Sequence, residues 1–165
     1  SNGGSYEDLD GNHIDGVVFS KSDICFNGKG SLMIMAKSGH GVVTKDDLKV
    51  TDGNITVNAS EGHGFSGKDS VRIADGNIIV NCGKDGIHSE NAEDTAKGYV
   101  YIGGGNLDIT SGGDGIAAGG IIQVDAVELK VLAGGGNDNK STALDENGDM
   151  VSSKGIKAAR DISAS

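Results

Sequence analysis

The sequence predicts an all-β protein: a right-handed, single-stranded parallel β-helix with three strands per coil, about six coils and a repeat of 22–23 residues. Three observations lead to this fold class: the composition, two glycine markers that recur in step, and short apolar segments that alternate with polar residues. The 165 residues include 29 Gly, 3 Phe, no Trp and no Pro, so the core must be built from aliphatic side chains. Short Val/Ile runs between Gly, Asn and Asp are typical of many short strands joined by turns.

The first marker is a glycine that opens a similar stretch in each repeat. It occurs at Gly41, Gly64, Gly86, Gly115 and Gly155. The first two gaps are 23 and 22 residues; the third is 29 because of an insertion near residues 92–98, and the last is 40 because of residues 134–153. A second marker, Gly-Asn followed by Ile or Leu, begins at Gly53, Gly76 and Gly105 with the same gaps of 23 and 29. Two markers that keep step indicate a structural repeat.

Within each repeat, three short segments alternate as strands with one inward face require. The aligned inward positions of the first segment are Val42/Thr44, Phe65/Gly67, Ile87/Ser89, Ile116/Ala118 and Ile156/Ala158. Those of the second are Leu48/Val50, Val71/Ile73, Val100/Ile102 and Ile122/Val124, and those of the third begin at Ile55, Ile78, Leu107 and Leu129. One repeat cannot cover its own apolar face, so successive repeats must stack. An antiparallel sandwich or barrel would not demand a fixed period with residue types kept in register.

The two ends of the chain are less regular. An N-terminal coil is recognisable because Ile24, Phe26 and the segment 32–36 match the second and third strands. We predict a linker or cap over residues 1–15 and one β-helix domain over residues 16–165. The chain stops just after a coil begins, and stacked repeats need a cap. We therefore expect further coils or a partner to cover this end.

The charge and the cysteines restrict the function classes. A formal charge of −10 argues against nucleic-acid binding, which needs Lys and Arg to neutralise phosphates. No apolar stretch approaches membrane-spanning length, so no membrane insertion is expected, and no signal peptide is recognisable. Cys25 and Cys82 fit no metal-binding pattern. Their alignment predicts that Cys82 is a small buried filler and Cys25 a surface thiol.

The carboxylates predict calcium as a cofactor. Asp85 and Asp114 occupy equivalent positions in adjacent coils, so their backbones should lie about 4.8 Å apart, where two negative charges repel unless a cation neutralises them. The neighbouring insertion and loop add oxygen ligands. The predicted metal set is Asp85, Glu90, Asn91, Glu93, Asp94, Asp114, Asn137 and Asp138. Such a set suits Ca²⁺, which takes roughly six to eight oxygen ligands. The alternative is that these side chains face water. Two further acidic segments, 8–12 and 145–149, resemble calcium loops but lack the complete EF-hand pattern.

Histidines and asparagines also recur at the turns. His40 and His63 are equivalent to Asp85, and we interpret them as turn residues, with a metal site as the weaker alternative. His88 is expected to face outward and to be isolated. The Gly-Asn marker predicts a ladder of stacked side-chain amides formed by Asn54, Asn77 and Asn106.

One outward column of the second strand predicts a carbohydrate-binding surface. It consists of Lys49, Arg72, Tyr101 and Gln123. A row of two cations, an aromatic ring and an amide suits a sugar groove in which the cations meet uronate carboxylates. A solvated sheet face is the competing interpretation.

Several segments closely resemble a known family. They are SKSDICFNGKGSLMIMA, GKDSVRIADGNIIV, GKDGIHSENAEDTAKGYVYIGGGNLDI, SGGDGIAAGGIIQV and SSKGIKAARDI, and together they run from about residue 16 to residue 162. The family consists of bacterial carbohydrate-binding domain-containing proteins, first described in a cellulolytic clostridium. The resemblance implies a pectate-lyase-like β-helix, bound calcium, an extracellular location and binding of cellulose or polygalacturonate. On the DGIHSEN and GGDGI segments it implies Asp85, Glu90, Asn91, Asp94 and Asp114 as metal ligands.

Three functions remain open at this point. The first is a secreted, non-catalytic, calcium-dependent module for plant cell-wall polysaccharide, in which calcium bridges an acidic protein and an acidic sugar. The second is a calcium-dependent lyase, which needs a base near the acidic edge; Lys84 and Lys97 flank that edge. The third is a structural or adhesive repeat segment of a larger surface protein. The oligomeric state does not follow from the sequence.

Overall fold

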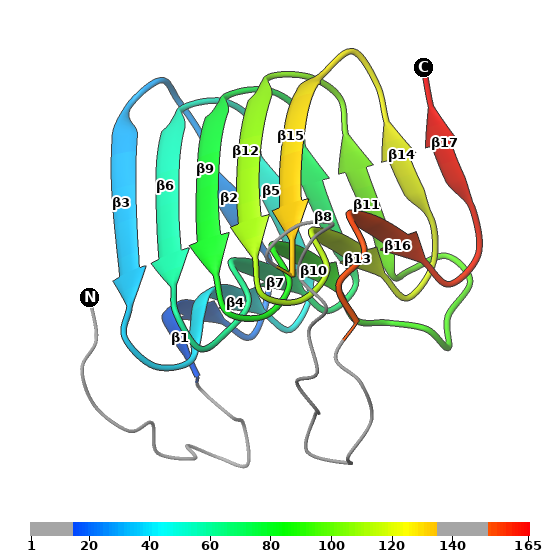
Figure 1. Cartoon of the computed structure of the whole chain (residues 1–165), viewed down its shortest axis with the longest axis horizontal. Coiled ribbons are helices and arrows are strands. Elements are labelled where there is room, and N and C mark those ends of the chain that lie inside the picture. The colour runs from blue at the N-terminus through cyan, green and yellow to red at the C-terminus, as the bar shows by residue number, and fades with distance from the viewer. Residues whose placement is uncertain (1–14, 135–151) are drawn as a thin grey trace.

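A computed structural model describes residues 15–134 and 152–165, and in these segments the regular structure is entirely β. The strands form three parallel sheets, and the chain visits each sheet once per coil. Figure 1 shows the coils stacked side by side, with the first coil at one end and β17 at the other. The predicted all-β parallel β-helix with three strands per coil is confirmed.

Sheet 1 contains β1 (Gly16–Ser20), β4 (His40–Thr44), β7 (Phe65–Gly67), β10 (Ile87–Ser89), β13 (Ile116–Ala118) and β16 (Ile156–Ala158). Sheet 2 contains β2 (Ile24–Phe26), β5 (Asp47–Val50), β8 (Ser70–Ile73), β11 (Tyr99–Ile102), β14 (Ile122–Val124) and β17 (Ile162–Ala164). Sheet 3 contains β3 (Ser31–Ala36), β6 (Asn54–Ala59), β9 (Asn77–Cys82), β12 (Asn106–Ser111) and β15 (Glu128–Ala133).

Each strand pairs with its counterpart one repeat further on, in the register that the apolar alignment predicts. Phe65, for example, pairs with Val42 on one side and Ile87 on the other. These columns point inward and form one continuous core, in which Phe65 is the one fully buried aromatic ring among the described residues. Cys82 packs against this core, and burial raises the pKa of its thiol to about 12, whereas Cys25 is exposed. The prediction for Cys25 is confirmed, whereas Cys82 is half-buried and not fully buried as predicted.

The first coil is more complete than its sequence indicates. Its second and third strands were recognisable, but the structure adds β1, which pairs with β4. In this strand Gly16 aligns with His40 and Val18 with Val42, so Val17 stands where the later coils have the marker glycine.

The marker glycines permit close approach between coils. A Cβ atom at Gly64 would lie 2.6 Å from the carbonyl oxygen of Gly86 and would also collide with Val80. The same environment recurs at Gly41, Gly86 and Gly115. At these four positions the glycine therefore follows from the lack of space for a Cβ atom and not from turn conformation, whereas an added Cβ atom at Gly155 would meet no atom within 4 Å.

The polar outer face of sheet 3 carries the asparagine ladder. Asn77 Nδ2 donates to Asn54 Oδ1 over 3.0 Å, and Asn106 lies in register with Asn77. A second rung that the sequence did not predict joins Asn81 Nδ2 to Asn58 Oδ1, also over 3.0 Å. These contacts tie adjacent coils together along the sheet.

The described segments contain no helix of the length and apolarity needed to cross a membrane.

Candidate functional site

The residue before each marker glycine forms a ladder along the edge of sheet 1. Its members are His40, His63, Asp85, Asp114 and Lys154. The side chain of one coil accepts a hydrogen bond from the backbone N–H of the equivalent residue in the next coil. The distances are 2.8 Å for His63 N to His40 Nδ1, 3.0 Å for Asp85 N to His63 Nδ1, 2.7 Å for Asp114 N to Asp85 Oδ1 and 2.7 Å for Lys154 N to Asp114 Oδ1. Imidazole and carboxylate are interchangeable here because each supplies an acceptor.

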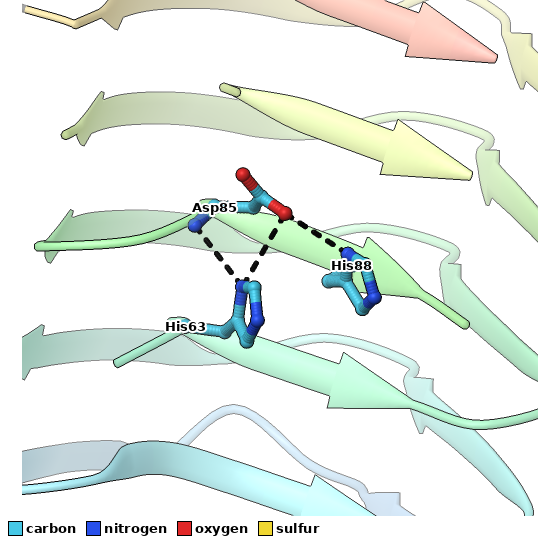
Figure 2. A group of neighbouring side chains, drawn as sticks. All are labelled: His63, Asp85 and His88. Carbon is cyan, nitrogen blue, oxygen red and sulfur yellow. Dashed lines mark hydrogen bonds and ion pairs between the residues drawn. The ribbon is translucent and has the colours of Figure 1, made fainter. Parts of the chain in front are cut away.

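Three imidazole rings stack beside this ladder. The ring centroids of His40 and His63 lie 4.8 Å apart with an interplanar angle of 6°, and those of His63 and His88 lie 4.5 Å apart at 19°. Figure 2 shows His88 beside Asp85, with its Nδ1 3.0 Å from Asp85 Oδ2. The prediction that His88 is isolated is therefore wrong. The carboxylate three residues earlier holds the ring of His88 over His63, in the coil where the ladder residue itself has no ring.

The environment keeps the two ladder histidines neutral. The His63 side chain is 16% exposed. Burial, followed by the nearby charge of His88, lowers the pKa of His63 to about 3, and burial also lowers the pKa of His40. Because His63 Nδ1 accepts a hydrogen bond, its proton lies on Nε2. His40 has the same tautomer, since its Nε2 lies 3.0 Å from Asp15 Oδ2.

The two central carboxylates interact with protein groups. Burial alone would raise the pKa of Asp85, but hydrogen bonds from His88 and from the Asp114 amide lower it. Asp114 is 2% exposed. Its Oδ1 accepts from Lys154 N and from Ser152 Oγ, both over 2.7 Å, and its Oδ2 lies 3.3 Å from Lys157 Nζ. Asp85 and Asp114 are adjacent, as expected, but protein donors already occupy the oxygens that were expected to face an ion.

Replacing Asp114 tests whether the ladder contributes to stability. We expect Asp114→Ala to lower the free energy of unfolding by about 2 kcal/mol, because it leaves the Lys154 amide without an acceptor and removes the partner of Lys157. Asp114→Asn keeps an Oδ1 acceptor and should cost less than half as much. Urea unfolding of both variants gives the comparison, and equal losses would contradict the hydrogen-bonding role.

Four more members of the predicted metal set, Glu90, Asn91, Glu93 and Asp94, lie in the loop between β10 and β11. Asn91 Oδ1 accepts from the amides of Glu93 and Asp94, over 3.2 and 3.0 Å, and its Nδ2 donates to Asp69 Oδ1 over 3.1 Å. Glu90, which precedes Asn91, is exposed to solvent. Asn91 thus organises its own loop and contacts Asp69 instead of Asp85. Asn137 and Asp138 lie outside the described residues, as do the acidic segments 8–12 and 145–149.

A second acidic group, which sequence analysis missed, lies at the turn from sheet 1 to sheet 2. Oxygen atoms of Asp23, Asp46 and Asp47 lie within 4.8 Å of one another. Desolvation and the negative charges of Asp23 and Asp69 raise the pKa of Asp46. The signal was available, because Asp23 and Asp47 precede register partners in adjacent coils and are therefore in equivalent positions.

The predicted outward column on sheet 2 is present. In the strand register Arg72 stands between Lys49 and Tyr101, and Tyr101 stands next to Gln123. The Tyr101 ring lies across Gly103, where a Cβ atom would come within 2.8 Å of the hydroxyl oxygen. Sequence analysis overlooked Tyr99, which alternates with buried Val100 and so faces outward on the same strand.

Two features of this column differ from a row of free side chains. Arg72 Nη2 lies 3.1 Å from Asp47 Oδ2, so its charge is already partly neutralised. Gln123 Nε2 donates to Asp125 Oδ2 over 2.6 Å. These contacts hold both side chains in defined positions on the sheet.

The stacked parallel sheets and the fold comparison define the class: this is a β-helix protein with a polysaccharide-lyase-like fold. A solved structure described as the polysaccharide lyase-like protein from C. thermocellum, gadolinium derivative, superposes with a TM-score of 0.80 and 33% identity, covering 97% of this chain and 58% of that chain.

The chain belongs to the family of carbohydrate-binding domain-containing proteins, whose family description matches residues 1–165. A relative from Acetivibrio thermocellus, named carbohydrate-binding domain-containing protein, is 43% identical over 130 residues, which are 79% of this chain and 45% of the relative. The chain therefore spans about half the length of these relatives. The family resemblance predicted from the sequence motifs is confirmed.

Proposed function

We propose that this chain is a secreted, non-catalytic, calcium-dependent carbohydrate-binding module for plant cell-wall polysaccharide, with acidic sugars such as polygalacturonate, or cellulose, as ligands. Membership of a carbohydrate-binding family supports the general class of ligand. The observation that carries the proposal is the outward column of sheet 2, which combines an aromatic ring, two cations and an amide in register.

The chemistry of this face fits an extended sugar chain. Tyr99 and Tyr101 offer apolar rings against which sugar C–H groups pack, while Gln123 offers an amide for hydroxyl groups. Arg72 is suited to a carboxylate because its guanidinium presents planar pairs of N–H donors. Parallel strands repeat about every 4.8 Å, so a polymer running along the coils meets one side chain of the column at each step.

Calcium is part of the proposal because an acidic protein and an acidic polysaccharide repel each other. The charge of −10 would oppose the binding of a polyuronate unless a divalent cation lay between them. Among the described residues, the carboxylates of Asp23, Asp46 and Asp47 converge, and desolvation together with the charges of Asp23 and Asp69 raises the pKa of Asp46. Both oxygens of Asp47 already interact with Ser70 and Arg72, so Asp23 and Asp46 would be the main ligands of an ion here. Asp85 and Asp114 fit less well, since protein donors occupy their oxygens.

Affinity pull-down on pectate, cellulose and xylan, with and without EGTA, tests the module. We expect retention on at least one polymer, with loss of pectate retention in EGTA. Binding to none of the three would contradict the module, and EGTA-resistant retention on pectate would contradict its calcium dependence.

Variants test the proposed face. Removing one well-placed contact typically costs more than about 1 kcal/mol, so Tyr101→Ala and Arg72→Ala should each weaken binding at least about fivefold. Lys130→Ala is the matched control, because Lys130 is 76% exposed on sheet 3 and its loss also removes one positive charge. An equal effect of Lys130→Ala would assign the binding to net charge.

The description of the structural neighbour as polysaccharide lyase-like favours a second candidate, a pectate-type lyase. A lyase needs a basic side chain to remove a proton from the sugar. Lys97 is poorly suited to this role, because its hydrogen bond to Asp69 raises the pKa of Lys97 and keeps it protonated. A rise in absorbance from unsaturated uronate during incubation with pectate would establish the lyase. A structural or adhesive role, the third candidate, predicts no retention on any of the polymers.

A further inference from the structure

A cluster of metal-ligating side chains lies on sheet 1, where two imidazoles and a carboxylate come together. It is separate from the outward column of sheet 2. Ligand atoms of His63, Asp85 and His88 all lie within 4.8 Å of one another. Their side chains are 16%, 17% and 27% exposed, so the group is sheltered yet open to solvent on one side. Figure 2 shows both rings beside the Asp85 carboxylate.

The separations match those of ligands around one small ion. Asp85 Oδ2 lies 3.5 Å from His63 Nδ1 and 3.0 Å from His88 Nδ1. Zinc binds nitrogen and oxygen at about 2.0–2.2 Å in tetrahedral geometry, which places neighbouring ligand atoms roughly 3.4 Å apart. The two distances that involve Asp85 lie on either side of that value. The rings of His63 and His88 stack with centroids 4.5 Å apart, so they must turn for their in-plane lone pairs to meet at one ion.

We propose that His63, Asp85 and His88 form a binding site for a transition-metal ion of the zinc type, with water in the fourth position. The site goes beyond the proposed function and differs from it in the kind of ion. Calcium takes oxygen ligands, whereas imidazole nitrogen suits zinc, copper and nickel.

Binding changes the hydrogen bonds in a defined way. The proton on His88 Nδ1, which faces Asp85, must leave before this nitrogen binds the metal. A neutral His88 changes tautomer and carries its one proton on Nε2, whereas an imidazolium keeps its Nε2 proton and releases the Nδ1 proton to solvent. His63 is already neutral, and its Nδ1 lone pair is shared with the Asp85 amide, a bond that the ion displaces. The negative charge of Asp85 remains and favours the cation.

His40 provides an internal control because it stacks on His63 without belonging to the site. Its Nδ1 accepts from the His63 amide and its Nε2 lies 3.0 Å from Asp15 Oδ2, so both nitrogens have protein partners. Losing His40 removes one ladder acceptor, as losing His63 does, but it removes no proposed metal ligand.

The test is a titration of the full 165-residue chain with Zn²⁺ by calorimetry, and with Co²⁺ by visible absorption. The background carries His13→Ala and Cys25→Ser, so that these two side chains cannot contribute ligands. We expect one equivalent of zinc and the visible bands of tetrahedral cobalt. Millimolar calcium should not displace either ion. Binding of no zinc up to millimolar concentration, or equal competition by calcium, would overturn the proposal.

Variants locate the ion. His63→Gln, Asp85→Asn and His88→Gln should each weaken zinc binding by more than about tenfold, whereas His40→Gln should change it less than about twofold. His88→Gln is the decisive variant, because His88 accepts no amide from the ladder and its loss leaves every ladder hydrogen bond in place. Circular dichroism confirms that each variant is folded. Unchanged binding in His88→Gln, or an equal loss in His40→Gln, would reject the assignment.

Discussion

Gly86→Ala is expected to lower the free energy of unfolding by about 3 kcal/mol, at the upper end of the usual cost of overpacking. A Cβ atom at this position would lie 2.6 Å from the carbonyl oxygen of Gly115 and would collide with Cγ2 of Ile109. Neither atom can move freely, because one belongs to the backbone of the next coil and the other to a fully buried side chain. Relief therefore requires the spacing between two coils to change.

The matched control is Gly30→Ala, at a glycine with no neighbour within 4 Å of the added atom. It should alter stability by less than about 0.5 kcal/mol, as surface substitutions usually do. Urea unfolding followed by circular dichroism measures both variants. If Gly86→Ala were as stable as Gly30→Ala, the close approach of the coils at the marker glycines would be wrong.

Acid should destabilise this protein through His63 well above the pH at which carboxylates usually act. Burial lowers the pKa of His63 to about 3 in the folded state, from 6.5. Between these values the unfolded chain binds a proton at this residue and the folded chain does not. Stability is therefore complete above about pH 6.5 and falls as the pH decreases towards 3, by up to about 1.4 kcal/mol per pH unit.

Two other groups, His40 and Asp85, add to the pH dependence of stability in the same direction. The pKa of His40 is also lowered by burial, and it contributes over part of the same range. The pKa of Asp85 is lowered as well, so its contribution is present above its unfolded value of 3.8 and is lost as the pH falls through the folded value. The loss of stability that His63 and His40 explain is therefore steepest between pH 6.5 and 4.

The measurement is urea unfolding at intervals from pH 7 to pH 4, in the presence of EDTA so that metal ions do not contribute. His63→Gln keeps a side-chain oxygen as an acceptor for the Asp85 amide and should reduce the slope by close to one proton. Lys130→Gln, an exposed change on another sheet, should keep the slope of the parent protein. A His63→Gln variant with an unchanged slope would show that burial does not depress this histidine.

The outward column of sheet 2 illustrates how much the sequence predicts about a site. Alignment alone placed Lys49, Arg72, Tyr101 and Gln123 in one row, and the strand register agrees. It did not show that Arg72 forms an ion pair with Asp47, because that contact depends on how the Arg72 side chain bends toward the preceding coil. The role of the row in sugar binding stays a prediction.

Alignment of the repeats was not sufficient to predict the metal ligands. Asp85 and Asp114 were correctly placed in adjacent coils, and their proximity is real. The partners of their oxygens were not visible, because two of them are backbone amides. Others are the side chains of Ser152 and Lys157, which follow a long insertion. His88 was missed for a related reason, since its contact with Asp85 crosses the turn within one coil.

The sequence by itself determined the architecture of this protein: three strands per coil, the stacking order and the inward columns. It could do so because a parallel stack repeats the same environment every 22–23 residues, and each column therefore appears as a periodic choice of residue. Only the tertiary structure decided which charges and lone pairs are paired along the edge of sheet 1. Those pairings depend on side-chain rotamers and on the direction of backbone amides, and neither leaves a periodic trace in the chain.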